Sequence, residues 1–354
     1  MIYFDITKAG RAGHRSGLTR VSTRLRTELG GAATEVVWND GFRPTASATR
    51  VTFSPQDWLL TPELFSAEER PGFADWLDAK PVRRAAIFHD AIPLKHPHIT
   101  WPQSVARHPG YLKGLARFDR IWAVSEASRQ ELIDFWRWQG AVSFPAVDVL
   151  PLGADFHSHP RITSRPATES KNPRRQAPPQ LLSVGILEPR KNQLFLLGVC
   201  EQLWREGLVF ELHLVGRVNP HFGAPIVTQI KTLRKKFPTF LRYHEAASDT
   251  VLSDLFARAH ATVFPTLAEG CGLPLLESLW RGVPCVCSDL PVLRENADAG
   301  GCATVPLHAP DEWKAALRRV LTDETWFIRL QKEAVSRPLP TWASAAKILT
   351  EALA

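Results

Sequence analysis

The chain has 354 residues, of which 44% are hydrophobic and 22% charged, and a formal net charge of +7. This length exceeds what one compact core normally serves, so two domains are expected, and the composition is ordinary for a soluble globular protein. No segment approaches the roughly 18 consecutive apolar residues of a membrane-spanning helix. The strand-like start, Met1–Asp5, lacks the layout of a signal peptide, so we expect a cytoplasmic protein. The positive charge favours an anionic partner such as a nucleotide diphosphate, nucleic acid or anionic lipid headgroups.

Short apolar runs alternate with amphipathic segments from the first residue to about residue 156. Helices are expected over Thr19–Leu29 and Glu126–Trp138, where Ser125 is a typical N-cap residue. The apolar runs predict strands at Ile2–Asp5, Glu35–Trp38, Arg84–His89, Arg120–Val124 and Ala146–Leu150.

Residues 157–180 are rich in proline and basic residues and poor in apolar ones, which predicts an exposed linker. The alternation then resumes over residues 181–335, and residues 336–354 contain a further expected helix, Trp342–Ala354. Strands are expected here at Gln180–Val184, Glu211–Val215, Leu241–Tyr243, Ala261–Phe264 and Pro284–Cys287. The sequence therefore predicts an α/β protein with one domain over residues 1–156, a second over residues 181–335, and parallel sheets covered on both faces.

The stretch from Ala261 to Ser288 is the most informative in the chain. It reads as a strand, a glycine-rich turn, a short helix and a second strand, with Glu269 in the turn and Glu277 in the helix. Open α/β sheets bind ligands at the edge where such turns lie, so both carboxylates are candidates for one crevice. Taken alone, a glutamate at a helix start often only complements the helix dipole. The turn itself contains Gly270, Cys271, Gly272 and Leu273.

A second motif, Ser183–Asn192, places Arg190 and Lys191 just beyond a strand and Gly185, ahead of an expected helix. Backbone amides at a helix start, a forked guanidinium and a compact ammonium together suit a diphosphate. The next strand also ends in a glycine, Gly216. An adjacent Arg-Lys pair without such a context is more often a solvated loop.

In the first domain, a glycine-rich basic loop that includes Gly17 follows the first strand and leads into a helix expected to begin near Leu18. This loop contains Arg11, His14 and Arg15, whose charge suits an anion. His89 and Asp90 follow a later strand directly, and the next loop contains His96, His98 and Trp101.

These motifs resemble the donor-binding signature of the retaining glycosyltransferases of family 4, which have the GT-B fold. The resemblance implies two Rossmann-like, doubly wound parallel-sheet domains facing a cleft, with the last helix packing back on the first domain. It implies catalytic or sugar-site roles for Glu269, Arg190, Lys191 and His89. Glu277 is expected to bind ribose, and the other implied donor-binding positions are Gly17, Gly185, Gly216, Gly270, Cys271, Gly272 and Leu273. Arg11, His14, Arg15 and Asp90 are expected on the acceptor side.

The implied reaction transfers a sugar, with retention, from a nucleotide-diphosphate sugar to a glycan or lipid-linked acceptor, in a setting such as bacterial surface polysaccharide synthesis. No Asp-x-Asp motif or zinc-type cysteine spacing is present, so we expect no metal and no cofactor. The charge also suits peripheral contact with an anionic membrane at its inner face.

Other functions remain open from the sequence. A GT-B epimerase or phosphorylase would share the fold, and a phosphorylase would not need the ribose contact of Glu277. A catalytically inactive sugar-nucleotide sensor would keep the binding residues. A nucleic-acid-binding protein would show stacked aromatic residues and a continuous basic groove, and neither pattern stands out here.

Overall fold

The computed structural model describes residues 1–11, 17–79, 82–155, 160–164 and 178–354. The chain divides into two compact units. The first unit contains Met1–Gly153 and Pro340–Ala354, and the second contains Ala154–Leu339. Each unit has its own sheet and its own hydrophobic core, as expected for a chain of this length.

The sheet of the first unit has seven strands in the order β3-β2-β1-β4-β5-β6-β7. Their bounds are β1 Ile2–Asp5, β2 Ala33–Trp38, β3 Phe42–Pro44, β4 Trp58–Thr61, β5 Arg83–Phe88, β6 Arg120–Ala123 and β7 Ala146–Val149. Neighbouring strands are parallel except β2 and β3, which form an antiparallel hairpin. The expected parallel sheet therefore carries one antiparallel strand at its edge. Asp40 (φ +50°) and Gly41 (φ +117°) close the hairpin turn, because both adopt a positive φ there.

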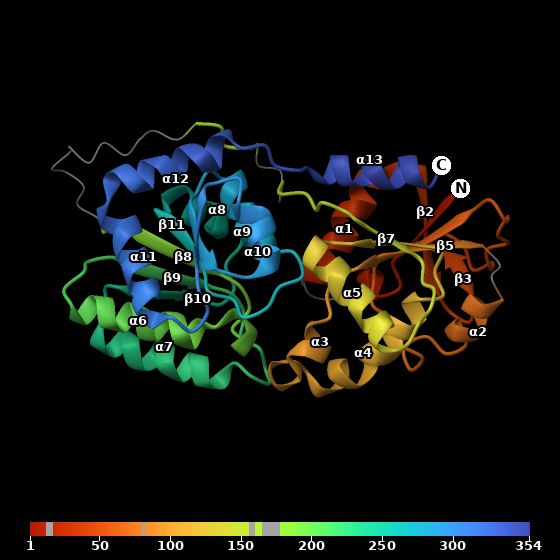
Figure 1. Ribbon diagram of the computed structural model, residues 1–354, viewed down its shortest axis with the longest axis horizontal. Coiled ribbons are helices and arrows are strands. Elements are labelled where there is room, and N and C mark those ends of the chain that lie inside the picture. Colours follow the sequence, from red (N-terminus) through yellow and green to blue (C-terminus); the bar gives the residue numbers. More distant parts are fainter. Residues whose placement is uncertain (12–16, 80–81, 156–159, 165–177) are drawn as a thin grey trace. The chain divides into compact units, whose positions relative to one another are not determined.

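Helices of the first unit are α1 Gly17–Leu29, α2 Phe73–Asp78, α3 Ile92–Lys95, α4 Pro102–Leu115, α5 Glu126–Trp138 and α13 Trp342–Ala352. Ser125 caps α5 as expected, since its side chain accepts the backbone N–H of Ser128 at 3.0 Å. Helix α13 lies beside α1 although the two are more than 300 residues apart in sequence (Figure 1). A side chain at Gly153 would collide with the backbone nitrogen of Trp342, at 2.2 Å, so this glycine permits the start of α13 to pack closely.

The sheet of the second unit has six parallel strands in the order β10-β9-β8-β11-β12-β13. The strands are β8 Gln180–Val184, β9 Glu211–Val215, β10 Leu241–His244, β11 Ala261–Phe264, β12 Cys285–Ser288 and β13 Cys302–Val305. The helices are α6 Gln193–Arg205, α7 Ala224–Lys236, α8 Asp249–Arg258, α9 Leu273–Trp280, α10 Pro291–Ala297, α11 Pro310–Thr322 and α12 Glu324–Ser336.

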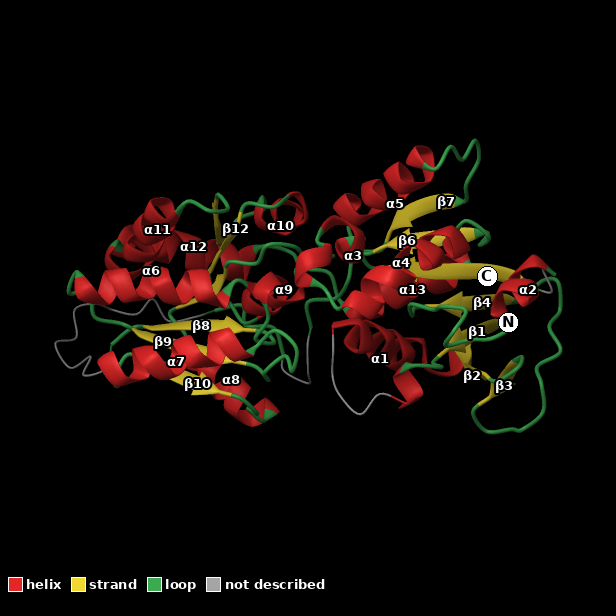
Figure 2. Cartoon of the chain, turned by 90° about the horizontal axis from the view of Figure 1, so that it is seen from below, coloured by secondary structure: helices red, strands yellow, loops and turns green. Residues whose placement is uncertain are grey.

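Both faces of this second sheet are covered. Leu181 and Leu182 are adjacent on β8 and therefore point to opposite faces. Leu181 packs in a cluster with Leu196 of α6, and Leu182 packs in a separate cluster with Phe256 of α8. Figure 2 shows helices on both sides of β8 and β9 accordingly. The predicted class, two Rossmann-like α/β units, is confirmed.

Each sheet reverses its winding direction at one point. In the first unit the chain runs from β1 to β2 and β3 on one side, then continues from β4 on the other side of β1. In the second unit the same reversal falls between β8 and β11. At such a point the loops beyond the carboxyl ends of the two neighbouring strands diverge and leave a crevice, which is where open α/β sheets bind ligands.

Candidate functional site

The loops that follow β8 and β11 are tied together at the reversal point of the second sheet. The first loop continues into a short 3-10 helix, Pro189–Lys191, and the second runs through residues 265–272 to α9. The carbonyl oxygen of Arg190 accepts the backbone N–H of Leu267 at 2.8 Å and the hydroxyl of Thr266 at 3.0 Å. These hydrogen bonds bring side chains of both predicted motifs to one place.

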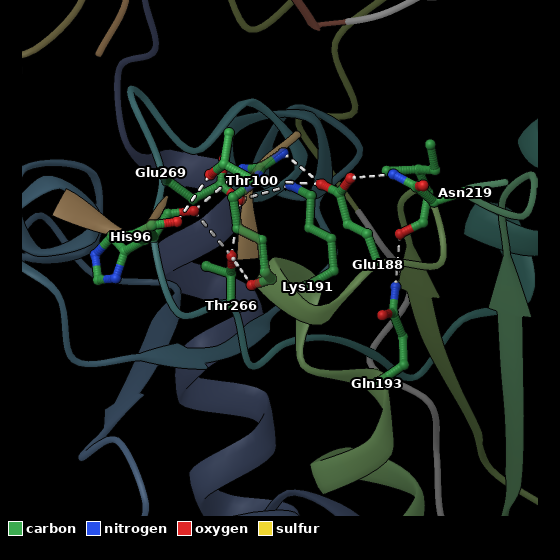
Figure 3. A network of polar contacts seen from close by, with 11 residues as sticks. His96, Thr100, Glu188, Lys191, Gln193, Asn219, Thr266 and Glu269 are labelled. Atoms are coloured by element: carbon green, nitrogen blue, oxygen red, sulfur yellow. Dashed lines mark hydrogen bonds and ion pairs between the residues drawn. The ribbon is translucent and has the colours of Figure 1, made fainter. Parts of the chain in front are cut away.

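Glu269 is the centre of this group. Its Oε1 accepts hydrogen bonds from Lys191 Nζ at 2.5 Å, Thr266 Oγ1 at 2.8 Å and Arg190 Nη1 at 3.0 Å. The guanidinium of Arg190 also lies 2.9 Å from Oε1 of Glu188. Figure 3 shows the side chains of Lys191 and Thr266 pointing toward Glu269. The three residues predicted from two separate motifs, Arg190, Lys191 and Glu269, are thus in direct contact.

The group is largely shielded from water, so its charges interact strongly. The side chains of Lys191 and Glu269 are 11% and 8% exposed. Burial raises the pKa of Glu269, but Lys191 and Arg190 outweigh it and hold this pKa below its ordinary value. Burial lowers the pKa of Lys191, and the neighbouring Glu269 opposes that shift. We therefore describe the pair as a buried carboxylate beside a buried ammonium.

Two glycines of the second unit are required by the backbone around this group. A side chain at Gly216 would place its Cβ 2.0 Å from the carbonyl oxygen of Gly185, and Gly216 has a φ of +153°. Gly272 has a φ of +82° at the start of α9, where a Cβ would meet Leu293 at 2.5 Å. The structure thus gives a packing reason for these glycines, while their predicted contact with a ligand stays a prediction.

The remaining predicted residues of this loop surround the turn into α9. Gly270 and Leu273 flank Cys271 and Gly272, and the carbonyl oxygen of Cys271 accepts Asn296 Nδ2 at 2.6 Å. Burial raises the pKa of the Cys271 thiol to about 12, which makes it an inert thiol rather than a nucleophile.

Glu277 lies in α9, in the helix that follows the loop of Glu269, and is 1% exposed. Burial lowers the pKa of Arg281, one turn further along the chain, and the negative charge of Glu277 opposes that shift. The placement agrees with the expected order of strand, turn and helix. The ribose contact of Glu277 stays a prediction.

Sequence reasoning gave no role to three polar residues of the group. Glu188 was part of the recognised motif, while Thr266 and Asn219 were not singled out. Asn219 is 2% exposed, donates to Glu188 Oε2 at 3.2 Å, and accepts the backbone N–H of His221 at 3.0 Å. It therefore holds Glu188 beside Arg190. One sequence signal could have identified Thr266: it is a polar residue just beyond β11, a strand at the reversal point.

In the first unit, His89 and Asp90 follow β5 as predicted. His89 is 6% exposed, its Nε2 lies 2.8 Å from the carbonyl oxygen of Pro62, and burial lowers its pKa, which favours the neutral ring. Asp90 Oδ1 accepts the backbone N–H of Ile92, the first residue of α3, at 3.0 Å. His108 Nε2 lies 3.1 Å from the carbonyl oxygen of Asp90. These hydrogen bonds give both residues a structural task, and their roles toward a ligand stay predictions.

The predicted basic loop is only partly described. Gly17 is the first residue of α1, and Arg11 ends a short 3-10 helix, Ala9–Arg11. His14 and Arg15 lie outside the described residues. The start of this loop is anchored by Glu63, a residue that the sequence did not single out. Its carboxylate accepts the backbone N–H groups of Lys8 at 2.7 Å and Ala9 at 2.6 Å.

Two general findings concern membranes and metals. Among the described residues, no helix is long and apolar enough to cross a membrane. Within the same part of the chain, no group of three or more His, Cys, Asp or Glu residues is arranged to hold a metal ion. The five cysteines are unpaired, and four of them are buried.

Comparison with known proteins shows which family the chain resembles. Residues 178–323 match the family model described as glycosyl transferases group 1. The serotype-specific mannosyltransferase WbdA of Escherichia coli is 30% identical over 322 residues, which cover 84% of this chain and 38% of the relative. The O-antigen chain mannosyltransferase B of Escherichia coli is 32% identical over 146 residues, 41% of this chain and 37% of the relative. The chain thus spans less than two-fifths of the length of these curated relatives.

Solved structures show the same fold at low sequence identity. Sucrose-phosphate synthase of Thermosynechococcus elongatus matches with a TM-score of 0.71 and 16% identity, over 99% of this chain and 97% of that one. The apo structure of OtsA matches with a TM-score of 0.62 and 16% identity, over 85% of this chain and 73% of that one. The fold of the chain is accordingly GT-B.

Proposed function

Because residues 178–323 belong to the glycosyl transferases group 1 family, we propose that this chain is a glycosyltransferase of bacterial surface polysaccharide synthesis. It transfers a sugar from a nucleotide-diphosphate sugar to a glycan or lipid-linked acceptor. The names of the relatives in Escherichia coli, a mannosyltransferase WbdA and an O-antigen mannosyltransferase, support mannose as the transferred hexose. The observation that carries the proposal is the convergence of Arg190 and Lys191 on Glu269 at the reversal point of the second sheet.

The donor diphosphate binds at this group. Arg190 forks onto two phosphate oxygens, and Lys191 adds a compact positive charge beside them. Both cations then stabilise the negative charge that builds on the diphosphate as it leaves, and because the site is shielded from water this stabilisation is large. Glu269, which holds both cations in the present structure, accepts hydrogen bonds from hydroxyls of the donor sugar. Glu277 accepts hydrogen bonds from the ribose.

The reaction proceeds with retention. The acceptor hydroxyl attacks the anomeric carbon from the side of the leaving group, a new C–O bond forms, and the bond from the anomeric carbon to the phosphate oxygen breaks. A phosphate oxygen of the departing nucleotide takes the proton of the acceptor hydroxyl, so no side chain acts as the base. Arg190 and Lys191 supply the positive charge at the diphosphate, and the reaction is independent of metal ions. His89, with its neutral ring, shapes the sugar site.

The nature of the acceptor bears on the cellular location of the protein. We place the chain in the cytoplasm, with peripheral contact to an anionic membrane that presents a lipid-linked acceptor, since the net charge is +7. Sedimentation with vesicles of anionic phospholipid tests this. Binding that disappears at high salt supports it, and a chain that stays in the supernatant at low salt contradicts it.

A thermal-shift titration with GDP, UDP, ADP and dTDP, without metal, tests the donor site. A nucleotide that binds only the folded chain raises its melting temperature, by an amount equivalent to about 2.7 kcal/mol at a hundredfold excess over Kd. We expect one nucleotide to do so. The shift is expected to be smaller in Glu277→Gln, and to persist in Glu245→Gln, a change at an exposed glutamate of the same unit. If none of the four raises the melting temperature of the folded wild type, the proposal is wrong and a phosphorylase becomes the better reading.

A further inference from the structure

The loops that follow β8 and β9 are paired beyond the ends of these strands. Leu187 and Val218 form an isolated parallel bridge, which continues the register of β8 and β9. The backbone N–H of Asn219 then donates to the carbonyl oxygen of Leu187 at 3.1 Å. This pairing brings Glu188 and Asn219, the residues that follow the bridge on either side, next to each other.

The side-chain amide of Asn219 has a fixed orientation. Its Oδ1 accepts the backbone N–H groups of His221 at 3.0 Å and Phe222 at 3.2 Å. Because these two N–H groups require an acceptor, the oxygen and the nitrogen of the amide cannot exchange places. Nδ2 therefore faces Glu188 and donates to its Oε2 at 3.2 Å, and Figure 3 shows the two side chains pointing toward each other. Since Asn219 is only 2% exposed, this donor is held in a place that is shielded from water.

The other oxygen of Glu188 holds the guanidinium of Arg190. Oε1 of Glu188 lies 3.1 Å from Nε and 2.9 Å from Nη2 of Arg190. At the other end of the guanidinium, Nη1 donates to the carbonyl oxygen of Ala268 at 3.1 Å and to Glu269 Oε1 at 3.0 Å. Contacts at both ends fix the position and the plane of this guanidinium.

One of these contacts does not persist in the proposed reaction. There Glu269 turns to hydroxyls of the donor sugar, and the diphosphate takes its place beside Arg190. Glu188 and the carbonyl oxygen of Ala268 still hold the guanidinium at that stage. A carboxylate beside a diphosphate repels it, so the charge of Glu188 does not favour a direct contact with the donor.

We propose that Glu188 and Asn219 are positioning residues that hold the guanidinium of Arg190 in place as the diphosphate leaves. Asn219 fixes Glu188, Glu188 fixes Arg190, and Arg190 contacts the diphosphate. A donor that is already oriented stabilises the developing charge without reorganising during the reaction. Both oxygens of Glu188 have partners, so this carboxylate acts through Arg190 and does not take the acceptor proton. This inference rests on the proposed function, for which it names the residues that orient Arg190.

Exchanging the two polar groups tests the positioning role. Glu188→Gln keeps the shape of the side chain but turns an NH2 group toward Nδ2 of Asn219, so two donors face each other. Asn219→Asp places a second carboxylate against that of Glu188. In the double variant Glu188→Gln/Asn219→Asp, the new amide donates to the new carboxylate while its oxygen still faces Arg190. The chain of hydrogen bonds is therefore broken in each single variant and restored in the double variant.

Initial rates with GDP-mannose and α-mannotriose measure kcat, and titration calorimetry with GDP measures Kd. We expect each single variant to lower kcat about 10–100-fold, the effect of misplacing a group that acts in the transition state. The double variant should return to within about threefold of the wild type. Glu188→Gln should bind GDP at least as tightly as the wild type, because a negative charge beside the diphosphate is removed.

Glu201→Gln is the matched control. The carboxylate of Glu201 is 18% exposed, against 14% for Glu188, and it lies 2.8 Å from the guanidinium of Arg205 on α6. It has no contact with Arg190 among those that the structure describes, so its loss should leave kcat unaltered. Melting temperatures of all variants show whether they are folded. If Asn219→Asp does not fold, the comparison of Glu188→Gln with the double variant still decides.

The outcomes separate the positioning role from the proposed function. If Glu188→Gln keeps the kcat of a wild type that transfers the sugar, the positioning role is wrong while the donor site stands. A folded double variant that is as slow as Glu188→Gln also overturns it, since the carboxylate of Glu188 would then act in its own right. If the wild type transfers no sugar and none of the four nucleotides raises its melting temperature, the proposed function fails and the positioning role fails with it.

Discussion

Lys191 Nζ lies 2.5 Å from Oε1 of Glu269, although the two residues are 78 positions apart in sequence. The contact joins the loop after β8 to the loop after β11, and it exists because these strands are neighbours in the sheet. Together with Arg190, this contact places two cations and one carboxylate in a site that is shielded from water. In the proposed reaction the two cations stabilise the negative charge of the leaving diphosphate.

Replacing Lys191 tests whether its ammonium group stabilises the leaving diphosphate. We expect Lys191→Ala to lower kcat about 10²–10³-fold, the usual effect of removing one group that stabilises charge in the transition state. Initial rates of sugar transfer measure the change. Lys231→Ala, at an exposed position of α7, is the control and should leave kcat unaltered. A Lys191→Ala variant within about threefold of the wild-type rate would remove Lys191 from the mechanism.

Gly216 offers a test of the backbone that supports the site. Its Cβ would lie 2.0 Å from the carbonyl oxygen of Gly185, so Gly216→Ala must displace the loop that leads to Lys191. We expect it to lower the free energy of unfolding by about 1–3 kcal/mol. Gly198→Ala, in α6 with open space around it, should instead raise it by about 0.5–1 kcal/mol. Urea unfolding of both variants decides, and a Gly216→Ala variant as stable as wild type contradicts the packing argument.

Glu63 predicts how stability depends on pH. Burial and the nearby Asp5 raise its pKa from 4.5 to about 7, although Lys8, Ala9 and Arg70 donate hydrogen bonds to it. The folded chain therefore keeps this proton to a higher pH than the unfolded chain. Between pH 4.5 and about 7 the contribution of Glu63 to stability falls as pH rises, by about 3 kcal/mol in total.

Urea unfolding across this pH window measures the effect. Glu63→Gln cannot ionise, so it should flatten the slope. The loss of one backbone hydrogen bond makes it less stable than the wild type at low pH, and this deficit should shrink as pH rises toward 7. Glu351→Gln, at a carboxylate that is 66% exposed on α13, should keep the wild-type slope. If Glu63→Gln has the same slope as the wild type, the carboxyl group of Glu63 has its ordinary pKa in the folded chain, which contradicts the prediction.

Metal removal tests whether Arg190 and Lys191 suffice at the diphosphate. We expect excess EDTA to leave the transfer rate unchanged, because these two cations supply the positive charge that a divalent ion supplies in other transferases. The rate is compared before and after chelation, and again after adding Mg²⁺ or Mn²⁺. A rate that EDTA abolishes and either ion restores would show that the cations are insufficient.

Much of the second unit was predictable because its strands are short, mainly apolar runs that alternate with helical segments. Gln180–Val184, Glu211–Val215 and Ala261–Phe264 have the bounds expected from the sequence. Short elements without a clear pattern were not predicted. The three-residue strand β3 depends on its antiparallel pairing with β2. The strands Trp58–Thr61 and Cys302–Val305 were not predicted either.

The residues of the site could be predicted from the sequence, but the contacts between them could not. Arg190, Lys191 and Glu269 stand out by their placement beyond strands, but the sharing of one carboxylate oxygen follows from the order of strands in the sheet. The anchor of the first loop is less visible still. Arg70 donates to Glu63 at 3.1 Å, and both side chains are buried, yet their sequence context resembles an ordinary polar loop.

The most direct test of the central claim is the product itself. The chain is incubated with GDP-mannose, an α-linked donor, and α-mannotriose, and the new linkage is assigned from the one-bond carbon–proton coupling at its anomeric centre by NMR. The account predicts a longer oligosaccharide whose added mannose is α-linked. A β-linked product, or release of GDP with no new glycosidic bond, would contradict it.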